Sequence, residues 1–418
     1  MFIYTVKNGD SLFSIASQFQ FPLDKIREIN GLIDPTLVPG QALIVPSTVY
    51  IVQPGDSLYE ISQMSFLSVD TLRKANGLQS DILSIGMKLY LPARIKYPEE
   101  GLSYFIPATP EQIEMTTRNF SPYNAYFGIF EYHITAEGNL STLNNDELAV
   151  RASRKHRVAP LATITNLTPE GFSPNVTRQV LNSPELRNRL INNIYNLVKS
   201  KNYAGVNIDF EQIRTGERDL YTGFLRSLND RLNPEGFLTS VALHVKKSDS
   251  DYPGYDYGGI GAVVDFVFIM AYDWHETHSG PGPVAPIDEI RKTLDYAVQR
   301  MPRNKIILGV PRYGYDWTMD NGNVLNAKAV SVTAATETAM KYEVPIQYSI
   351  QHQQPYFTYW DENGKRHSVW FEDARARAAK FQIVVDYRLK GVGAWQLGLN
   401  FPQSVFLVGQ FFYQKRVI

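Results

Sequence analysis

The sequence predicts an α/β protein: a (β/α)8 TIM barrel with an inserted small α+β subdomain, preceded by two small βααβ modules. Three observations support this prediction. The first 94 residues contain an internal repeat, eight strand-like runs alternate with helical patterns from residue 102 onward, and an excess of residues precedes the last run. We expect the modules at residues 1–47 and 48–94 and the barrel at 95–418, with the insertion at about 315–370.

Composition and charge exclude several classes of protein. Of the 418 residues, 44% are hydrophobic and 20% are charged, as in an ordinary globular protein. A net charge of −1 gives no electrostatic basis for binding nucleic acid or an anionic membrane. The absence of cysteine excludes disulfides and thiolate metal sites, and no apolar run is long enough to span a membrane. We therefore expect a monomer that binds neither nucleic acid nor a membrane.

The N-terminal repeat has a constant offset of 46 residues, which separates Gly9 from Gly55 and Asn30 from Asn76. In each copy the hydrophobic spacing predicts the order strand, helix, helix, strand. The aspartate after each of these first glycines can cap the first helix, and Ser57 with Glu60 fits a capping box in the second copy. The glycine after each asparagine supplies the left-handed residue that ends the second helix. Each copy is therefore expected to fold as one small unit.

This pattern resembles the LysM module in its aromatic-x-Val opening, its Gly-Asp-Ser-Leu turn, its Asn-Gly-Leu centre and its closing proline. The resemblance implies binding to glycans that contain N-acetylglucosamine, such as peptidoglycan or chitin. The implied binding residues are Gly9, Asp10, Ser11, Leu12, Asn30, Gly31, Gly55, Asp56, Ser57, Leu58, Asn76 and Gly77. The alternative is that these residues only form turns in modules that bind protein. Duplication favours glycan binding, because two weak sites in tandem raise the apparent affinity.

The remaining three-quarters of the chain alternates strand-like and helix-like runs. The helical patterns are clearest at 183–200, 217–232, 286–300 and 372–389. The strand candidates are 102–106, 125–130, 159–165, 205–211, 238–244, 266–272, 305–310 and 393–397. This alternation indicates a (β/α)8 barrel. A doubly wound open sheet is the alternative, but no Gly-rich phosphate loop follows any of these strands.

The segment at about 315–370 is too long for a barrel loop. It contains alternating apolar and polar residues at 356–360 and 367–370, separated by a turn signal at 361–364. We interpret it as the inserted α+β subdomain, which would form one wall of a cleft. The linker at 98–101 is not low in complexity, so we expect the modules to rest against the barrel.

The stretch 205–211 organises the predicted site. Its side chains alternate, so Asn207, Asp209 and Glu211 share one face of a strand whose other face is apolar. Burying carboxylates without partners is costly and is tolerated mainly where they take part in chemistry. A surface edge strand with a polar outer face is the alternative.

Other candidate residues follow neighbouring strands. The sixth strand ends in Met270, Tyr272 and Asp273, the seventh runs into Arg312, and the eighth carries Trp395. Active sites of such barrels lie at the C-terminal ends of the strands. We therefore expect these residues to line one cleft together with the two carboxylates of the fourth strand.

These motifs resemble glycoside hydrolase family 18, the chitinase-like barrels. The family's fourth-strand signature, Asp-Gly-x-Asp-x-Asp-x-Glu, is matched at Asp209 and Glu211, whereas Ala204 and Asn207 stand at its first two Asp positions. The Met-x-Tyr-Asp motif of the sixth strand, the tryptophan of the eighth and the inserted subdomain also match. A lone Asp-x-Glu pattern would be weak evidence for this family, but the four matching features occur in the family's chain order and together make the resemblance specific.

The resemblance implies substrate-assisted hydrolysis with retention of configuration. Glu211 is implied as general acid and base, and the nucleophile is the carbonyl oxygen of the sugar's own 2-acetamido group. Asp209 and Tyr272 are implied to hold that group, which completes the catalytic set. The implied substrate-binding residues are Asn207, Met270, Asp273, Arg312 and Trp395.

The spacing of Asp209 and Glu211 on one strand face also predicts how their charges affect each other's pKa. Asp209 should raise the pKa of Glu211 and keep it protonated as an acid. Asn207 can hydrogen-bond Asp209 but, unlike an aspartate, cannot take up a proton. We therefore expect Asp209 to stay ionised and the pH–rate profile to report mainly on Glu211.

We expect no cofactor and no metal. His275 and His278 resemble a zinc-binding pair, but their spacing is i, i+3 rather than i, i+4 and they follow a strand. We interpret the other, scattered histidines as structural or surface residues.

Three functions fit these motifs. The tandem modules and the fourth-strand motif resemble the spore cortical-fragment lytic enzymes of Bacillus-type bacteria, which implies cleavage of β-1,4 bonds after N-acetylglucosamine in cortex peptidoglycan. A chitinase is the second possibility, but residues 1–10 lack a signal peptide. A non-catalytic glycan-binding barrel is the third, and the retained Glu211 disfavours it. The first function predicts synthesis in the mother-cell cytosol and location in the spore coat or cortex, with peptidoglycan as the partner.

Overall fold

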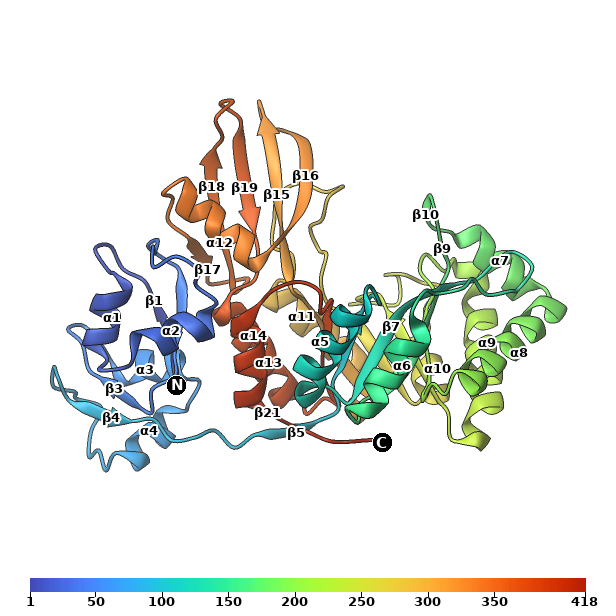
Figure 1. The fold of residues 1–418 in the computed structure, drawn as a ribbon, viewed down its shortest axis with the longest axis horizontal. Helices are drawn as coiled ribbons and strands as arrows, with labels where there is room; N and C mark the ends of the chain where they lie inside the picture. The colour runs from blue at the N-terminus through green and yellow to red at the C-terminus, as the bar shows by residue number, and fades with distance from the viewer.

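The computed structural model describes residues 1–418 and has three parts (Figure 1). The two N-terminal modules lie at one side, the barrel lies at the other, and the insert projects upward between them. None of the helices combines the length and the hydropathy that a membrane crossing requires.

Each module has the predicted order of elements. β1 pairs with β2 and β3 pairs with β4, both in antiparallel fashion. The bounds are β1 Phe2–Thr5, α1 Leu12–Gln18, α2 Leu23–Asn30, β2 Ala42–Val45, β3 Val49–Ile51, α3 Leu58–Ser65, α4 Val69–Ala75 and β4 Lys88–Tyr90. The first helix of each module begins after a serine, Ser11 or Ser57, that forms a capping box. The predicted capping box of Ser57 and Glu60 is confirmed, whereas the expectation that Asp10 and Asp56 cap these helices is wrong.

Eight parallel strands form the predicted barrel. Their bounds are β6 Leu102–Phe105, β7 Tyr126–His133, β8 Ala159–Thr165, β11 Gly205–Asp209, β12 Leu238–Leu243, β13 Phe266–Met270, β14 Ile306–Pro311 and β20 Gly391–Trp395. They pair in chain order, from β6 to β20. The first and last strands meet where the Leu397 N–H donates to the Tyr104 carbonyl at 2.9 Å, which nearly closes the barrel. The predicted fold class is confirmed.

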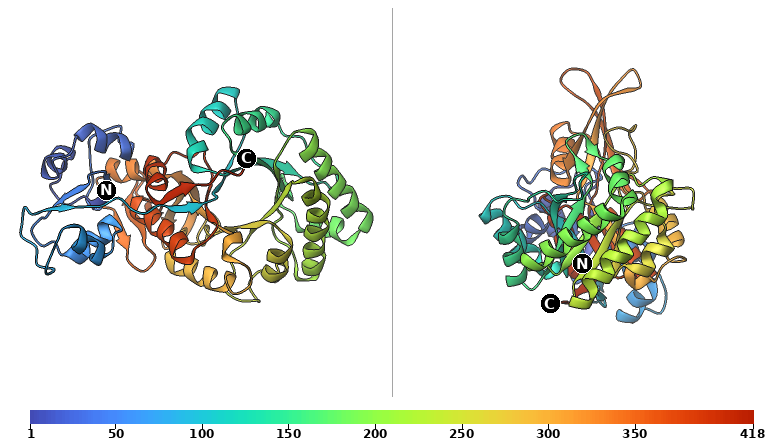
Figure 2. Two further views of the ribbon diagram at one scale, coloured as in Figure 1. Left: turned by 90° about the horizontal axis from the view of Figure 1, so that it is seen from below. Right: turned by 90° about the vertical axis from the view of Figure 1, so that its right-hand side faces the viewer.

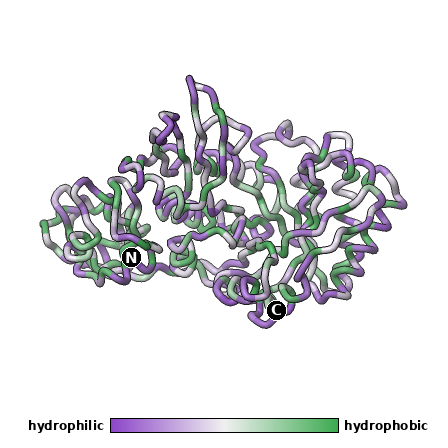
Figure 3. The backbone as a smooth tube through the Cα atoms, turned by 45° about the horizontal axis from the view of Figure 1, so that its top comes forward, coloured by the Kyte–Doolittle hydropathy of each residue, from purple (hydrophilic) through white to green (hydrophobic).

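Helices surround these strands (Figure 2). The bounds are α5 Pro110–Phe120, α6 Asp146–Lys155, α7 Pro174–Asn182, α8 Pro184–Ser200, α9 Arg218–Leu232, α10 Tyr257–Val263, α11 Ile287–Ala297, α13 Ala374–Tyr387 and α14 Pro402–Phe411, with a short hairpin of β9 Leu167–Thr168 and β10 Gly171–Phe172. Hydrophobic and hydrophilic stretches alternate along the whole chain (Figure 3). Phe210 stacks on Phe224 of α9 at 5.9 Å between ring centroids. The outward face of β11 is thereby anchored in the core.

The insert is a five-stranded antiparallel sheet with one helix. Its elements are β15 Tyr313–Asp320, β16 Asn323–Ser331, α12 Val332–Lys341, β17 Gln347–Ser349, β18 Gln354–Trp360 and β19 Arg366–Trp370. The strand order is β16-β15-β19-β18-β17. The predicted hairpin at 361–364 joins β18 to β19. β15 begins directly after barrel strand β14, so the insert lies over the C-terminal end of the barrel.

The modules rest against the barrel and against each other, as the linker composition predicts. The rings of Phe2 and Tyr50 join the two modules at 4.9 Å, and those of Phe66 and Phe411 join the second module to α14 at 5.8 Å. The linker itself forms β5 Tyr97–Glu99, which pairs in parallel with β21 Phe412–Gln414 near the C-terminus. The linker and the C-terminal segment therefore lie paired at the N-terminal side of the barrel.

Glu99 of this linker should make stability depend on pH. It is fully buried, its Oε2 accepts a hydrogen bond from the Val392 N–H at 2.8 Å, and burial raises its pKa to about 8. The unfolded chain loses this proton near the ordinary value of 4.5. Between these two pKa values the folded state binds more protons than the unfolded state, so the free energy of unfolding falls as the pH rises. The stability that Glu99 contributes is fully present below pH 4.5 and is lost toward pH 8, at up to about 1.4 kcal/mol per pH unit.

We expect Glu99→Gln to remove this slope, because the amide does not titrate. Thermal unfolding from pH 5 to pH 9 would show the melting temperature of the wild type falling more steeply than that of the variant. Glu100→Gln is the control, because Glu100 is paired with Lys390 and its pKa is lowered rather than raised. Parallel curves for the wild type and Glu99→Gln would contradict the prediction.

Candidate active site

β11 brings two carboxyl groups to the mouth of the barrel. The strand lies between β8 and β12, with Asn207 and Asp209 buried on its inner face and Ile208 packed toward the helices. Glu211 lies two residues beyond Asp209 and lines a cleft of about 500 Å³. Its side chain is 20% exposed, so it is open to a ligand but poorly solvated.

The surroundings of Glu211 favour its protonated form. Burial raises the pKa of this carboxyl, and the negative charges of Asp209 and Asp273 raise it further. The fully buried side chain of Asn166 fixes the backbone: its Oδ1 accepts from the Glu211 N–H at 2.8 Å, and its Nδ2 donates to the Glu211 carbonyl at 2.9 Å. A carboxyl group that is held in place and kept protonated can act as a general acid.

Asp209 is buried and lacks a hydrogen-bond donor. Burial raises its pKa, and the charge of Glu131 adds to the effect, which opposes the expectation that Asp209 stays ionised at every pH. Its Oδ1 accepts no hydrogen bond within the protein. The predicted bond from Asn207 is absent, because the Asn207 amide instead accepts from Tyr104 Oη at 2.8 Å and donates to Ser240 Oγ at 2.9 Å.

Tyr272 and Asp273 lie just beyond the end of β13 and line the cleft. Tyr313 and Tyr315 of the insert donate their hydroxyls to Asp273 Oδ1 at 2.8 and 3.0 Å. Burial raises the pKa of Asp273 to about 6, although these two bonds oppose the shift. Burial also raises the pKa of Tyr272, so its phenol is a neutral donor. The insert thus positions a carboxyl group of the barrel.

Trp395 is the last residue of β20 and packs in an aromatic cluster at this end of the barrel. Its ring meets Phe130 at 4.6 Å and Tyr104 at 5.7 Å between centroids, in both cases edge to face. Met270 and Tyr272 pack against the same cluster and line the cleft, whereas Trp395 itself is not among the residues that line it. This arrangement gives the cleft an apolar side next to its carboxyl groups.

Arg312 does not reach the cleft. It is 4% exposed, its Nε donates to the Leu399 carbonyl at 3.0 Å, and its guanidinium lies over the ring of Phe120 at 5.2 Å. Val310, two residues earlier, packs in the core between strands and helices, and alternation places Arg312 on the same side. The prediction that Arg312 lines the subsites is therefore wrong.

His244 contradicts the interpretation of the scattered histidines as structural or surface residues. It follows β12, lines the cleft, and holds its Nε2 at 3.4 Å from Glu211 Oε2. Its ring stacks on Tyr252 at 4.4 Å between centroids. Burial lowers its pKa to about 4, so the neutral ring adds no positive charge beside Glu211. Its place at the end of a predicted strand is the signal in the sequence that could have identified it.

We expect His244→Ala to move the alkaline limb of the pH–rate profile to lower pH. Loss of the ring admits water beside Glu211, which reduces the burial that raises the pKa of its carboxyl. The measurement is kcat/KM as a function of pH, with Tyr252→Phe as the control that keeps the stacked ring. An alkaline limb that stays in place or moves upward would contradict this role for His244.

Comparison with known proteins decides the family. The model described as "Glycosyl hydrolases family 18" matches residues 167–400, more than half of the chain. The chain belongs to glycosyl hydrolase family 18. The LysM domain model matches residues 4–46 and 50–92, so this family 18 barrel follows two LysM domains.

Similar proteins extend the match over the whole chain. YdhD of Bacillus subtilis (strain 168), whose name describes a sporulation-specific glycosylase, is 47% identical over 420 residues and is covered in full, as is this chain. A cortical fragment-lytic enzyme of the same organism is 41% identical over 424 residues, covering 99% of this chain and 98% of the relative. The crystal structure of the Bacillus cereus spore cortex-lytic enzyme SleL has a TM-score of 0.89 at 37% identity and covers 99% of both chains. The LysM domains, the family 18 barrel and the insert are thus all shared.

The turn residues of the LysM domains have clear structural roles. Asp10 accepts hydrogen bonds from Tyr4 Oη and the Lys7 N–H, each at 2.7 Å, and Asp56 makes the equivalent pair. Leu12 and Leu58 are buried in the cores. Gly9 and Gly55 have positive φ and open space around them, so the first loop of each domain is accessible. Glycan binding by these loops stays a prediction.

The Asn-Gly pairs close the LysM domains. Asn30 Nδ2 donates to the carbonyls of Ile26 and Ile44, at 2.7 and 2.9 Å, and thereby ties α2 to β2. Asn76 makes the equivalent bonds in the second domain. Gly31 ends α2 in the left-handed conformation, with φ of 63°. The hydrogen bonds of both amides therefore fix the loop that follows the second helix, and a part for them in glycan binding stays a prediction.

Proposed function

We propose that this family 18 chain is a β-N-acetylglucosaminidase that cleaves β-1,4 bonds after N-acetylglucosamine in peptidoglycan fragments of the spore cortex. The observation that carries the proposal is the pairing of Glu211, in surroundings that keep it protonated, with Asp209, whose buried Oδ1 has no donor. Relatives named as cortical fragment-lytic enzymes support the choice of substrate.

In the first step Glu211 gives its proton to the glycosidic oxygen while the bond from that oxygen to C1 breaks. The carbonyl oxygen of the 2-acetamido group attacks C1 from the opposite face and forms an oxazolinium ring. Asp209 Oδ1 accepts the acetamido N–H, which supplies its absent donor and stabilises the positive charge that develops on the group. Tyr272 donates to the acetamido oxygen and holds it in line for attack.

In the second step Glu211, now ionised, takes a proton from water as that water attacks C1. The oxazolinium ring opens, the acetamido group is restored, and the product keeps the β configuration. Glu211 ends the cycle protonated. Its raised pKa suits this double role, because the group is protonated when the first step begins and readily takes up a proton in the second.

The surrounding parts suit a glycan substrate. The aromatic cluster around Trp395 gives an apolar surface for a sugar ring, and the two LysM domains supply further glycan contacts. Peptidoglycan is the proposed partner, and the spore coat or cortex, after synthesis in the mother cell, is the proposed location.

The test is mass spectrometry of the products from cortex muropeptides and from chitin oligomers, each incubated with the wild type and with Glu211→Gln. We expect muropeptides with N-acetylglucosamine at the new reducing end, formed only by the wild type. Muramic reducing ends would overturn the proposal. Efficient cleavage of chitin with no action on muropeptides would assign the chain to the chitinases instead.

A further inference from the structure

The first LysM domain is fixed on the barrel by contacts that the second lacks. Three side chains of its sheet, Ile3, Ala42 and Ile44, belong to the buried core of the barrel. The positions 46 residues later carry Val49, Lys88 and Tyr90, which are half-buried or exposed. The two repeats therefore differ on the sheet face that the barrel covers in the first.

Polar contacts complete this attachment. Gln403 Nε2 donates to Asn30 Oδ1 at 2.8 Å, and Arg375 donates to the Gly40 carbonyl at 2.9 Å. A Cβ at Gly40 would lie 1.7 Å from the carbonyl oxygen of Ile346 in the insert, so only glycine fits there. The first LysM domain thus contacts the barrel and the insert at the same time.

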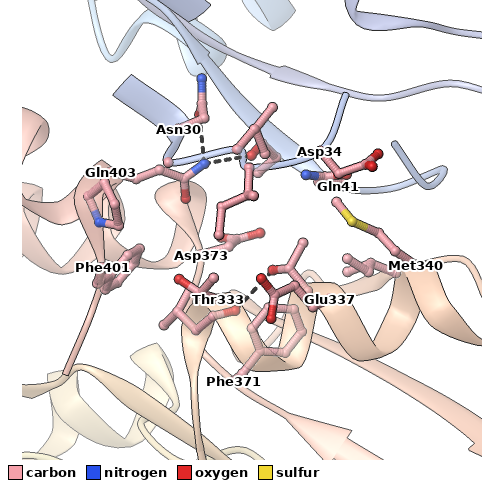
Figure 4. A pocket seen from close by; sticks show the side chains of 18 residues that line it. Asn30, Asp34, Gln41, Thr333, Glu337, Met340, Phe371, Asp373, Phe401 and Gln403 are labelled. Atoms are coloured by element: carbon pink, nitrogen blue, oxygen red, sulfur yellow. Dashed lines mark hydrogen bonds between the residues drawn. The ribbon is translucent and has the colours of Figure 1, made fainter. Parts of the chain in front are cut away.

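These contacts enclose a cavity of about 170 Å³ where the three parts meet (Figure 4). Residues 30–34 of the first LysM domain form one side, α12 of the insert forms another, and residues 401–403 close it. Its apolar walls include Leu32, Met340, Phe371 and Phe401. Since one water takes up about 30 Å³ in the liquid, the cavity can hold an acetamido group with the ring atoms that carry it.

Two polar groups in this cavity have no partner in the protein. Gln41 is only 4% exposed; its Oε1 accepts from the Val38 N–H, but its Nε2 makes no hydrogen bond. Thr333 on α12 has a hydroxyl that makes none either. In Figure 4 these two side chains reach the cavity from the LysM domain and from the insert. Both groups are open to the cavity, and an apolar pocket with a few convergent polar groups is the usual form of a site for a small ligand.

The charges restrict the kind of ligand. The ionisable residues of the lining are Asp34, Glu337 and Asp373, and no lysine, arginine or histidine is among them. Asp373 is paired with Arg375 at 2.7 Å, whereas Asp34 and Glu337 have no cation partner. An anionic group such as a lactyl or peptide carboxylate is therefore repelled, and a neutral sugar is not.

We propose that this cavity is a second saccharide site, which binds the 2-acetamido group of one N-acetylglucosamine residue between the first LysM domain and the insert. Gln41 Nε2 donates to the acetamido oxygen, Thr333 Oγ1 accepts the acetamido N–H, and the methyl group packs on Met340, Phe371 and Phe401. The site rests on the proposed function, since the same glycan fills the cleft. It holds that glycan at a fixed position relative to Glu211.

Methionine methyl groups can test this site because three of the 8 methionines lie at different places. Met340 lines the cavity, Met270 lines the catalytic cleft, and Met64 lines the hollow beside Gly55 in the second LysM domain. The full chain carrying Glu211→Gln, labelled with 13C at the methionine methyls, is titrated with tri-N-acetylchitotriose and followed by NMR. We expect the Met340 signal to shift in a saturable manner.

Two variants locate the effect. Thr333→Trp fills the cavity from α12 and should abolish the Met340 shift. Ile33→Ser removes an apolar side chain that is 81% exposed, so the fold tolerates it, and should weaken the Met340 titration several-fold. Gln79→Ser is the matched control, since Gln79 is the equivalent position in the second LysM domain, and should leave Met340 unchanged.

The outcomes separate this proposal from the proposed function. A Met340 signal that stays in place while Met270 shifts overturns the cavity site and leaves the enzyme intact. A shift of Met340, together with wild-type protein that releases no N-acetylglucosamine reducing ends from cortex muropeptides, supports the cavity and contradicts the proposed function. An equal shift of Met340 with the cationic trimer of glucosamine overturns acetamido recognition, because the carboxylates alone would then explain binding.

Discussion

Glu211→Gln should lower kcat/KM by about 10³-fold or more, because one carboxyl group serves as acid in the first step and as base in the second. The amide keeps the shape of the side chain and its contacts but can neither give nor take a proton. Substrate binding should persist, since the aromatic cluster around Trp395 is unchanged. Initial rates on a chromogenic N-acetylglucosaminide, with binding measured by calorimetry, give both quantities.

Glu137→Gln is the matched control, because Glu137 is exposed and lies outside the cleft. It should retain full activity. The melting temperature of Glu211→Gln should equal or exceed that of the wild type, because the substitution removes a buried carboxyl group whose raised pKa is unfavourable to folding at neutral pH. A variant that keeps a tenth of the wild-type rate would rule out Glu211 as the acid.

Asp209→Asn should have the second largest effect, a fall of about 10²–10³-fold in kcat, the range found when a preorganised charge-stabilising group is removed. The amide can still contact the acetamido group but cannot stabilise its positive charge. The alkaline limb of the pH–rate profile should also move to lower pH, because the negative charge that helps to raise the pKa of Glu211 is lost.

Asp230→Asn serves as the control, because Asp230 is exposed on α9. Two readouts distinguish a catalytic role for Asp209 from a structural one. A structural role would lower the melting temperature and leave the pH profile in place. A catalytic role moves the alkaline limb and leaves KM nearly unchanged. An unmoved limb with full binding would contradict the electrostatic coupling of the two carboxyl groups.

Much of the barrel could be predicted because its pattern is local. The alternation of residues 205–211 specifies which side chains share a face, whatever the rest of the chain does. The offset of 46 residues likewise identifies two copies of one fold without any contact information. The insert was recognisable from the excess length between two strands and from its hairpin signal.

The immediate surroundings of Glu211 depend instead on barrel closure. Asn166 and His244 follow two different strands, Glu131 lies in a third, and no spacing rule relates these distant residues. The direction of Arg312 could not be derived either, since it lies just past a strand end and its register with neighbouring elements decides which way it points. Asn166, His244 and Glu131, by contrast, surround Asp209 and Glu211 and contribute to the burial and charge that shift the pKa of these two carboxyl groups.

The sequence by itself determined the fold class, the two LysM domains and the carboxyl pair of β11, because each follows from periodicity within a short segment. Only the tertiary structure decided which contacts attach the first LysM domain to the barrel, that His244 contacts Glu211 and that a cavity forms beside the insert. Those features depend on which distant surfaces meet, and burial and hydrogen bonding at such surfaces exist only once the chain has folded.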